Sequence, residues 1–158
     1  MATGARTVAN RFLELAQAKG QSLTPLQLMK LVYIAHGWML GIHRRPLITD
    51  HIEAWKLGPV IPRLYRCVKA YGANPITKLL SPFFGSEPAL DEAEADIIEQ
   101  TFDIYGGLSG IRLSALTHKP GTPWANTWTA DSWAAQIPND IISEHYTQLA
   151  SARPQADN

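Results

Sequence analysis

The longest hydrophobic pattern covers residues 25–40, a stretch with almost no polar side chain. Thr24 is placed to cap a helix, and Gln27, three residues later, completes a capping box. On a helical wheel, Gln27 and Lys30 share one narrow polar wedge, while the remaining directions are apolar. We predict that this segment is the central helix of the core, buried on most sides, and that Gly41 ends it.

Apolar positions at helical spacing predict five further helices. Their ranges are residues 7–19, 63–71, 91–105, 109–117 and 139–152, with Thr7 as the first cap and Leu149 on a buried face. Alternation at residues 52–55 indicates a short strand. The expected fold is therefore mainly α: a single compact helical domain of about six helices. We expect a strand or hairpin element near residues 50–60, and a second candidate strand lies at residues 74–77.

The chain has 158 residues with 14 basic and 14 acidic side chains, so its formal net charge is zero. The charges are unevenly divided: residues 1–80 carry +8 (11 − 3), and residues 81–158 carry −8 (3 − 11). Such asymmetry is typical of chains with a charged partner, but it also fits two halves that fold against each other. Length and composition predict one domain over residues 1–152 and a flexible tail over residues 153–158.

Residue types that carry catalysis or hold metals are sparse. Cys67 is the single cysteine, and no histidine pair has the helical i, i+4 spacing of a zinc site. His36 falls among apolar positions and is expected to be a hydrogen-bonded core residue. We expect no catalytic residue, metal or cofactor. The N-terminal residues lack the apolar core of a signal peptide, and no stretch approaches the ~20 residues of a membrane span, which predicts a cytoplasmic protein without a membrane partner.

The best candidates for function are basic and aromatic residues in the first half. A basic face could bind phosphate or an acidic protein surface, and nearby aromatic residues are either interface or core residues. The candidate partner-binding residues are Arg44, Arg45, Trp55, Lys56, Arg63, Tyr65, Arg66 and Lys69. The turn at residues 55–62 is stiffened by one glycine and two prolines, so it either presents Trp55 to a partner or steers the chain from strand to helix.

Several motifs resemble those of the Panacea domain, also called the SocA-like or GepA-like phage-associated domain. LQLMKLVY at residues 26–33 resembles the family's LQKLLYY helix, although Met29 replaces the usual lysine and Lys30 follows it. IEAWKLGPVIP at residues 52–62 is similar to the family signature, and LSALTH at residues 113–118 resembles a downstream motif. The likeness covers roughly residues 8–147 in the expected order.

This resemblance implies a mainly helical antitoxin of a bacterial toxin–antitoxin pair that neutralises a cognate toxin by direct binding. It also implies an alternative mechanism, because the SocA branch delivers its toxin to a ClpXP-type protease. The basic first half motivates a second hypothesis, a nucleic-acid-binding regulator of a prophage or mobile-element operon. A net charge of zero disfavours nucleic acid as a partner, and complementary halves leave a homodimer as a further alternative.

Overall fold

Helix α2 (Pro25–Trp38) lies at the centre of the computed structural model, which describes residues 3–81, 89–131 and 134–152. The predicted capping box is confirmed: Gln27 N donates to Thr24 Oγ1 at 3.3 Å, and Thr24 N donates to Gln27 Oε1 at 2.9 Å. Nearly every side chain of α2 is buried, as predicted. Within the polar wedge, Lys30 is buried as well, with 1% of the residue exposed, whereas Gln27 is half-buried.

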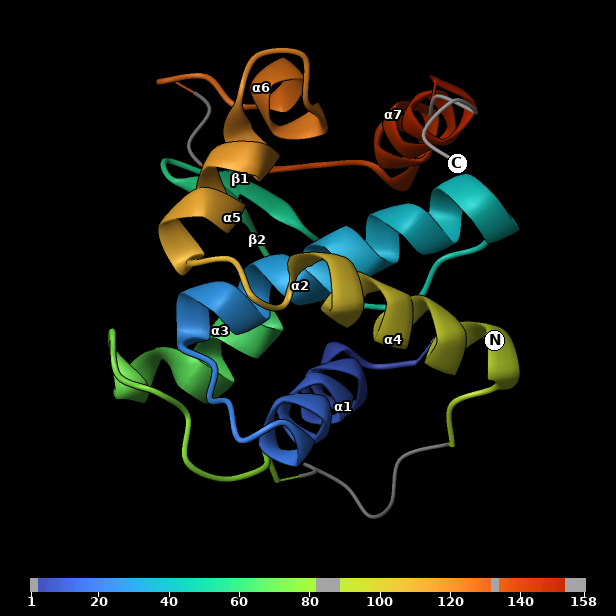
Figure 1. The fold of residues 1–158 in the computed structure, drawn as a ribbon. Coiled ribbons are helices and arrows are strands. Elements are labelled where there is room, and N and C mark those ends of the chain that lie inside the picture. The colour runs from blue at the N-terminus through green and yellow to red at the C-terminus, as the bar shows by residue number, and fades with distance from the viewer. Residues whose placement is uncertain (1–2, 82–88, 132–133, 153–158) are drawn as a thin grey trace.

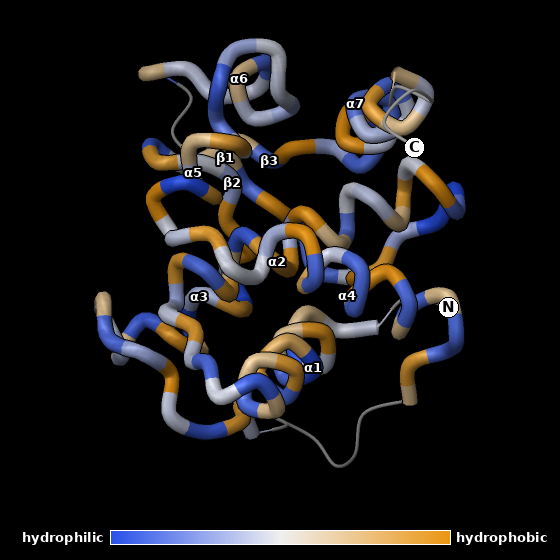
Figure 2. Tube along the Cα trace, viewed as in Figure 1, coloured by the Kyte–Doolittle hydropathy of each residue, from blue (hydrophilic) through white to orange (hydrophobic). Residues whose placement is uncertain are grey.

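Besides a short helix over residues 62–68, four helices pack against α2 and give the molecule its core (Figure 1). They are α1 (Ala5–Ala18), α4 (Glu92–Tyr105), α5 (Gly110–His118) and α7 (Asn139–Ala152). Figure 2 shows hydrophobic and hydrophilic positions alternating along α1 and α4, the pattern of helices with one buried face. The mainly α expectation is confirmed, with seven α-helices in the described residues. The expected tail at residues 153–158 lies outside them, and the single domain stays a prediction.

A small antiparallel sheet lies beside α5. Strands β1 (Glu53–Trp55) and β2 (Gly58–Val60) form the predicted hairpin, and β3 (Ala135–Gln136) pairs with the other edge of β1. Pro62 then opens α3 (Pro62–Val68), which continues as the 3₁₀ turn η2 (Lys69–Tyr71) and ends at Gly72. The short helix α6 (Pro123–Thr127), which the sequence did not predict, follows Thr122.

The candidate strand at residues 74–77 was wrong. Ile76 is buried, but its N–H makes a single bond of 2.8 Å to Leu23 O, and no ladder forms there. The inward position predicted for Leu149 was also wrong, because 40% of this residue is exposed. In both cases the apolar residues were identified correctly. Within the described part of the chain, no strand lies beside residues 74–77 to pair with them, and no element fully covers Leu149.

Two predicted helix ends were displaced. Helix α1 begins at Ala5 rather than at Thr7, because Asp50 Oδ1 accepts the Ala5 N–H at 2.8 Å and replaces a local cap. Gly41 does not end the second helix; it lies within a π-helical turn, η1 (Met39–His43). Helix α7 packs so closely there that a Cβ on Gly41 would lie 2.7 Å from the Tyr146 carbonyl carbon. None of the helices in the described residues combines the length and hydrophobicity needed to cross a bilayer.

Candidate partner-binding site

In the β1–β2 hairpin, the carbonyl groups of every second residue from 55 to 59 each accept a hydrogen bond from a side chain of a different helix. The bonds run from Trp124 Nε1 to Trp55 O (2.6 Å), from Ser114 Oγ to Leu57 O (2.7 Å), and from Lys30 Nζ to Pro59 O (2.8 Å). Because these donors belong to α6, α5 and α2, the hairpin is fixed to the helical core along its whole length. A surface fixed in this way loses little entropy when a partner binds.

Gly58 allows the hairpin to lie directly on α2. Its φ of +128° is a conformation that side-chain-bearing residues rarely adopt, and a Cβ there would lie 2.9 Å from Lys30 Nζ. Met29, which stands where the Panacea motif has lysine, accepts the Ile61 N–H on its sulfur at 3.3 Å. The displaced lysine, Lys30, is therefore a buried donor to the hairpin rather than a surface charge.

An apolar groove of about 390 Å³, here called the hairpin groove, lies between the hairpin, the first turns of α2 and α3. Its lining residues are Pro25, Leu26, Met29, Lys30, Trp55, Lys56, Leu57, Val60, Tyr65 and Gly72. Leu57 is 69% exposed, Leu26 39% and Tyr65 38%. Scattered exposed apolar residues are common, but three that line one groove indicate an interaction surface.

Trp55 is half-buried in the wall of this groove. Its ring packs edge-on against Tyr65 with centroids 5.2 Å apart, and its Nε1 donates to Glu53 Oε1 at 2.8 Å. His51 Nε2 lies 2.8 Å from the second carboxylate oxygen of Glu53. Burial alone would raise the pKa of Glu53, but these two hydrogen bonds and the nearby charge of Arg66 lower it overall. Glu53 is thus an ionised acceptor that orients the Trp55 ring.

The basic candidates beside the groove are all exposed. Lys56 lines the groove itself, and Arg63, Arg66 and Lys69 extend along α3 and η2 on either side of Tyr65. Arg63 lies 3.7 Å from Asp50, so its charge is partly compensated. The structure therefore brings together six of the eight candidates: Trp55, Lys56, Arg63, Tyr65, Arg66 and Lys69.

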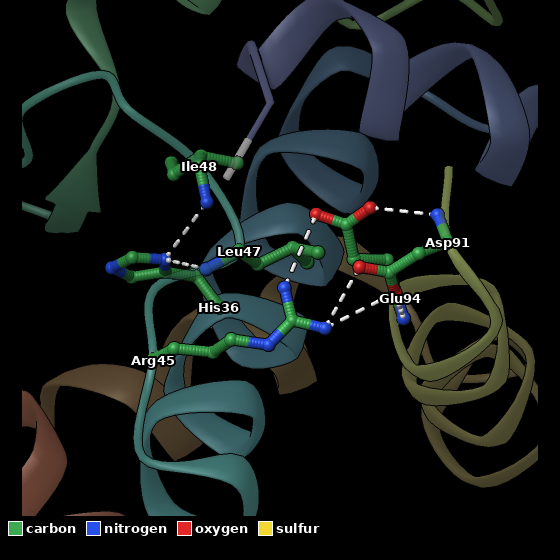
Figure 3. Close-up of polar contacts among 6 residues, drawn as sticks. All are labelled: His36, Arg45, Leu47, Ile48, Asp91 and Glu94. Carbon is green, nitrogen blue, oxygen red and sulfur yellow. Dashed lines mark hydrogen bonds and ion pairs between the residues drawn. The ribbon is translucent and has the colours of Figure 1, made fainter. Parts of the chain in front are cut away.

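Arg44 and Arg45 lie apart from this group, because they follow η1 at the C-terminal end of α2, whereas the groove is lined by its N-terminal turns. Arg45 is engaged within the molecule: its guanidinium lies 2.9 Å from an Asp91 carboxylate oxygen and 3.8 Å from Glu94 Oε2 (Figure 3). The pKa of Asp91 is lowered, first by its bond from the Glu94 backbone N–H and further by Arg45. Arg45 thus fastens the loop after η1 to the start of α4.

His36 confirms the expectation of a core histidine. Its Nδ1 accepts the backbone N–H groups of Leu47 (3.2 Å) and Ile48 (3.3 Å), as Figure 3 shows. Its Nε2 lies 2.9 Å from Asn139 Oδ1, which makes Nε2 the protonated nitrogen. Burial lowers the pKa of His36, so the neutral ring with one acceptor and one donor is the stable form.

The opposite charges of the two halves of the chain partly compensate each other. First-half bases reach acids of α4 or its cap in three places: Arg11–Glu99 (3.5 Å), Lys19–Asp103 (3.7 Å) and Arg45–Asp91 (2.9 Å). Of the two interpretations of the asymmetry, these pairs support halves that fold against each other. Around the hairpin groove, in contrast, Lys56, Arg66 and Lys69 have no ion pair with any acid of the described residues.

Sequence reasoning missed the residues that hold the hairpin and complete its groove. Ser114 belongs to the LSALTH motif at residues 113–118, and that membership was the available signal for it. Leu26 and Leu57 gave no local signal of exposure. Within the described residues, no group of three His, Cys, Asp or Glu side chains is placed to hold a metal ion.

The arrangement is that of a small helical domain that presents a rigid, apolar hairpin surface. The family model "Antitoxin SocA-like, Panacea domain" matches residues 28–125, and the chain belongs to this family. Among curated proteins, "Antitoxin SocA" of Caulobacter vibrioides (strain NA1000 / CB15N) is 37% identical over 127 residues, which cover 76% of this chain and 68% of that protein. No solved structure matches the chain.

Proposed function

We propose that this protein is a cytoplasmic antitoxin that neutralises a cognate toxin protein by direct binding at the hairpin groove. The observation that carries the proposal is the hairpin itself, fixed by three helices yet exposing Leu57 to solvent. Folding stability alone would favour burying a leucine, so its exposure suggests a role in binding. Membership of the SocA-like family and the name of the curated relative support the role of antitoxin.

The experiment is a test of growth rescue. The chain is expressed together with the toxin-like gene that adjoins its own gene, and growth and co-purification of the two proteins are measured. Rescue with a stable one-to-one complex is the expected result. If the wild-type chain neither restores growth nor binds the toxin, the proposed function is wrong.

A second candidate mechanism is delivery of the toxin to a protease. An adaptor needs two docking surfaces, and the chain has a second apolar groove of about 380 Å³, here called the helix groove, between α2, α4, α5 and α7. Its exposed aliphatic residues are Ile42, Ile104, Leu116 and Leu149. Toxin half-life separates the mechanisms: an adaptor shortens it in cells, whereas a stoichiometric blocker leaves it unchanged or lengthens it.

A further inference from the structure

The hairpin groove combines an apolar floor with uncompensated positive charge. Leu26, Leu57 and Tyr65 offer exposed apolar surface, and Lys56 stands on the wall of the same groove. Elsewhere on the molecule, three first-half bases, Arg11, Lys19 and Arg45, pair with acids of α4 or its cap. The groove is therefore a surface where a partner can gain both apolar contact and charge complementarity.

Basic side chains continue from the groove along α3. Arg66 follows Tyr65 directly, and Lys69 lies one helical turn after Tyr65, on the same face. The charge of Arg66 lowers the pKa of Glu53. The hydrogen bonds of the Glu53 carboxylate, however, come from Trp55 and His51 and not from Arg66. The positive charge on this side is thus available to carboxylates of a partner.

The edge of the sheet is unsuited to an added strand. β2 is an edge strand of three residues, and its central residue, Pro59, has no N–H to donate. The Pro59 carbonyl is already occupied by Lys30 Nζ. Recognition through side chains in a groove, as when an amphipathic helix inserts its apolar face, fits this surface better than strand addition.

We propose that the hairpin groove receives an acidic amphipathic helix of the partner protein, with its apolar side chains between Trp55, Leu57 and Tyr65 and its carboxylates facing Lys56, Arg66 and Lys69. This inference rests on the proposed function for the identity of the partner as a toxin. It adds what chemistry the toxin must present at that groove.

The first test uses the toxin that the wild-type chain neutralises. Leu57→Glu, and separately a triple variant carrying Lys56→Glu, Arg66→Glu and Lys69→Glu, should each weaken toxin binding about tenfold or more. The charge variant should also lose most of the salt dependence of binding. The matched controls are Arg44→Glu, an exposed arginine away from the groove, and Ile104→Glu in the helix groove; both should bind as wild type. Full affinity in the two groove variants, with folding confirmed by thermal melting, would overturn the inference while leaving the antitoxin role intact.

The second test needs no toxin. Two synthetic amphipathic helical peptides share leucines at i, i+4, i+7 and i+11, with glutamates at the other positions in one and lysines in the other. The acidic peptide should bind and shift the NMR indole signal of Trp55, and the Leu57→Glu variant should bind it about tenfold less tightly. Equal binding of both peptides, or binding unaffected by the substitution, would refute the proposed chemistry even if rescue succeeds.

Labelled duplex DNA is the third probe. DNA binding that disappears in the triple variant, without peptide binding, would refute the inference and favour nucleic acid as the partner.

Discussion

Lys30 offers the sharpest test of how the hairpin is held. It is only 1% exposed, has no acidic partner among the described residues, and gives a hydrogen bond to Pro59 O. Burial lowers its pKa from 10.5 to about 7. The lysine thus connects α2 to the hairpin at a cost in folding free energy that methionine, with a similar length and no charge, would not incur.

The sign and size of this cost follow from proton linkage. Between pH 7 and pH 10.5 the unfolded chain holds a proton on Lys30 that the folded chain has lost, so the unfolding free energy rises by about 1.4 kcal/mol per pH unit. At pH 7 and below the full penalty, about 5 kcal/mol, is present. Lys30→Met removes it but leaves the Pro59 carbonyl without a donor, which costs about 1–3 kcal/mol. The variant should therefore be about 2–4 kcal/mol more stable than wild type at pH 7.

The assay is urea unfolding, followed by tryptophan fluorescence, at several values between pH 7 and pH 9.5. This window lies above the titration of His36, whose pKa is lowered by burial. It also lies below the pKa near 10 at which tyrosines of the unfolded chain ionise, and burial raises the folded-state pKa of Tyr33 and Tyr146 above that value. The advantage of Lys30→Met should shrink with rising pH and vanish near pH 9, where the remaining penalty of about 2 kcal/mol equals the cost of the unpaired carbonyl. Lys78→Met, at an exposed lysine, should keep the wild-type slope. Parallel pH profiles for wild type and Lys30→Met would refute the reasoning.

Three further predictions concern the scaffold. Because the folded-state pKa of His36 lies below its unfolded value, stability should be lost as the pH falls below about 6.5, seen as a lower Tm at pH 5.5 than at pH 7; an unchanged Tm would contradict this. Gly41→Ala forces a Cβ onto the α7 backbone and should cost about 1–3 kcal/mol in unfolding free energy, whereas Gly107→Ala, with open space around it, should be nearly neutral. Arg45→Ala leaves the buried Glu94 carboxylate without its cation and should lower stability by about 1–3 kcal/mol while leaving toxin affinity unchanged. A loss of affinity in the folded Arg45→Ala variant would place this residue at the interface after all.

The features that sequence predicted well depend on neighbouring residues. The capping box at Thr24 needs only Gln27, and the helix predicted over residues 91–105 corresponds to α4, whose N-cap is Asp91. The hairpin near residues 50–60 likewise joins two strands across a short turn at residues 56–57. In each case the partner is a few residues away, so local spacing carries the information.

The features that sequence did not predict depend on partners far along the chain. Lys30 sits in a polar wedge on the helical wheel, but its acceptor, Pro59, comes from an element 29 residues later. From the sequence, Arg45 is indistinguishable from other surface bases. The fold places it beside Asp91, which is 46 residues away along the chain. The structure brings six of the eight predicted partner-binding residues together, whereas Arg44 and Arg45, which follow η1, lie at the other end of α2.

The hairpin divides its roles between backbone and side chains. The carbonyl groups of Trp55, Leu57 and Pro59 point to donors from three helices, so the backbone is fixed whatever side chains it carries there. Lys56 and Leu57 occupy the turn between the strands and are exposed, which means that substitutions at these two positions change the surface without removing a buried contact. The exposed side chains at residues 56 and 57 can therefore change while the same three hydrogen bonds keep the hairpin in place.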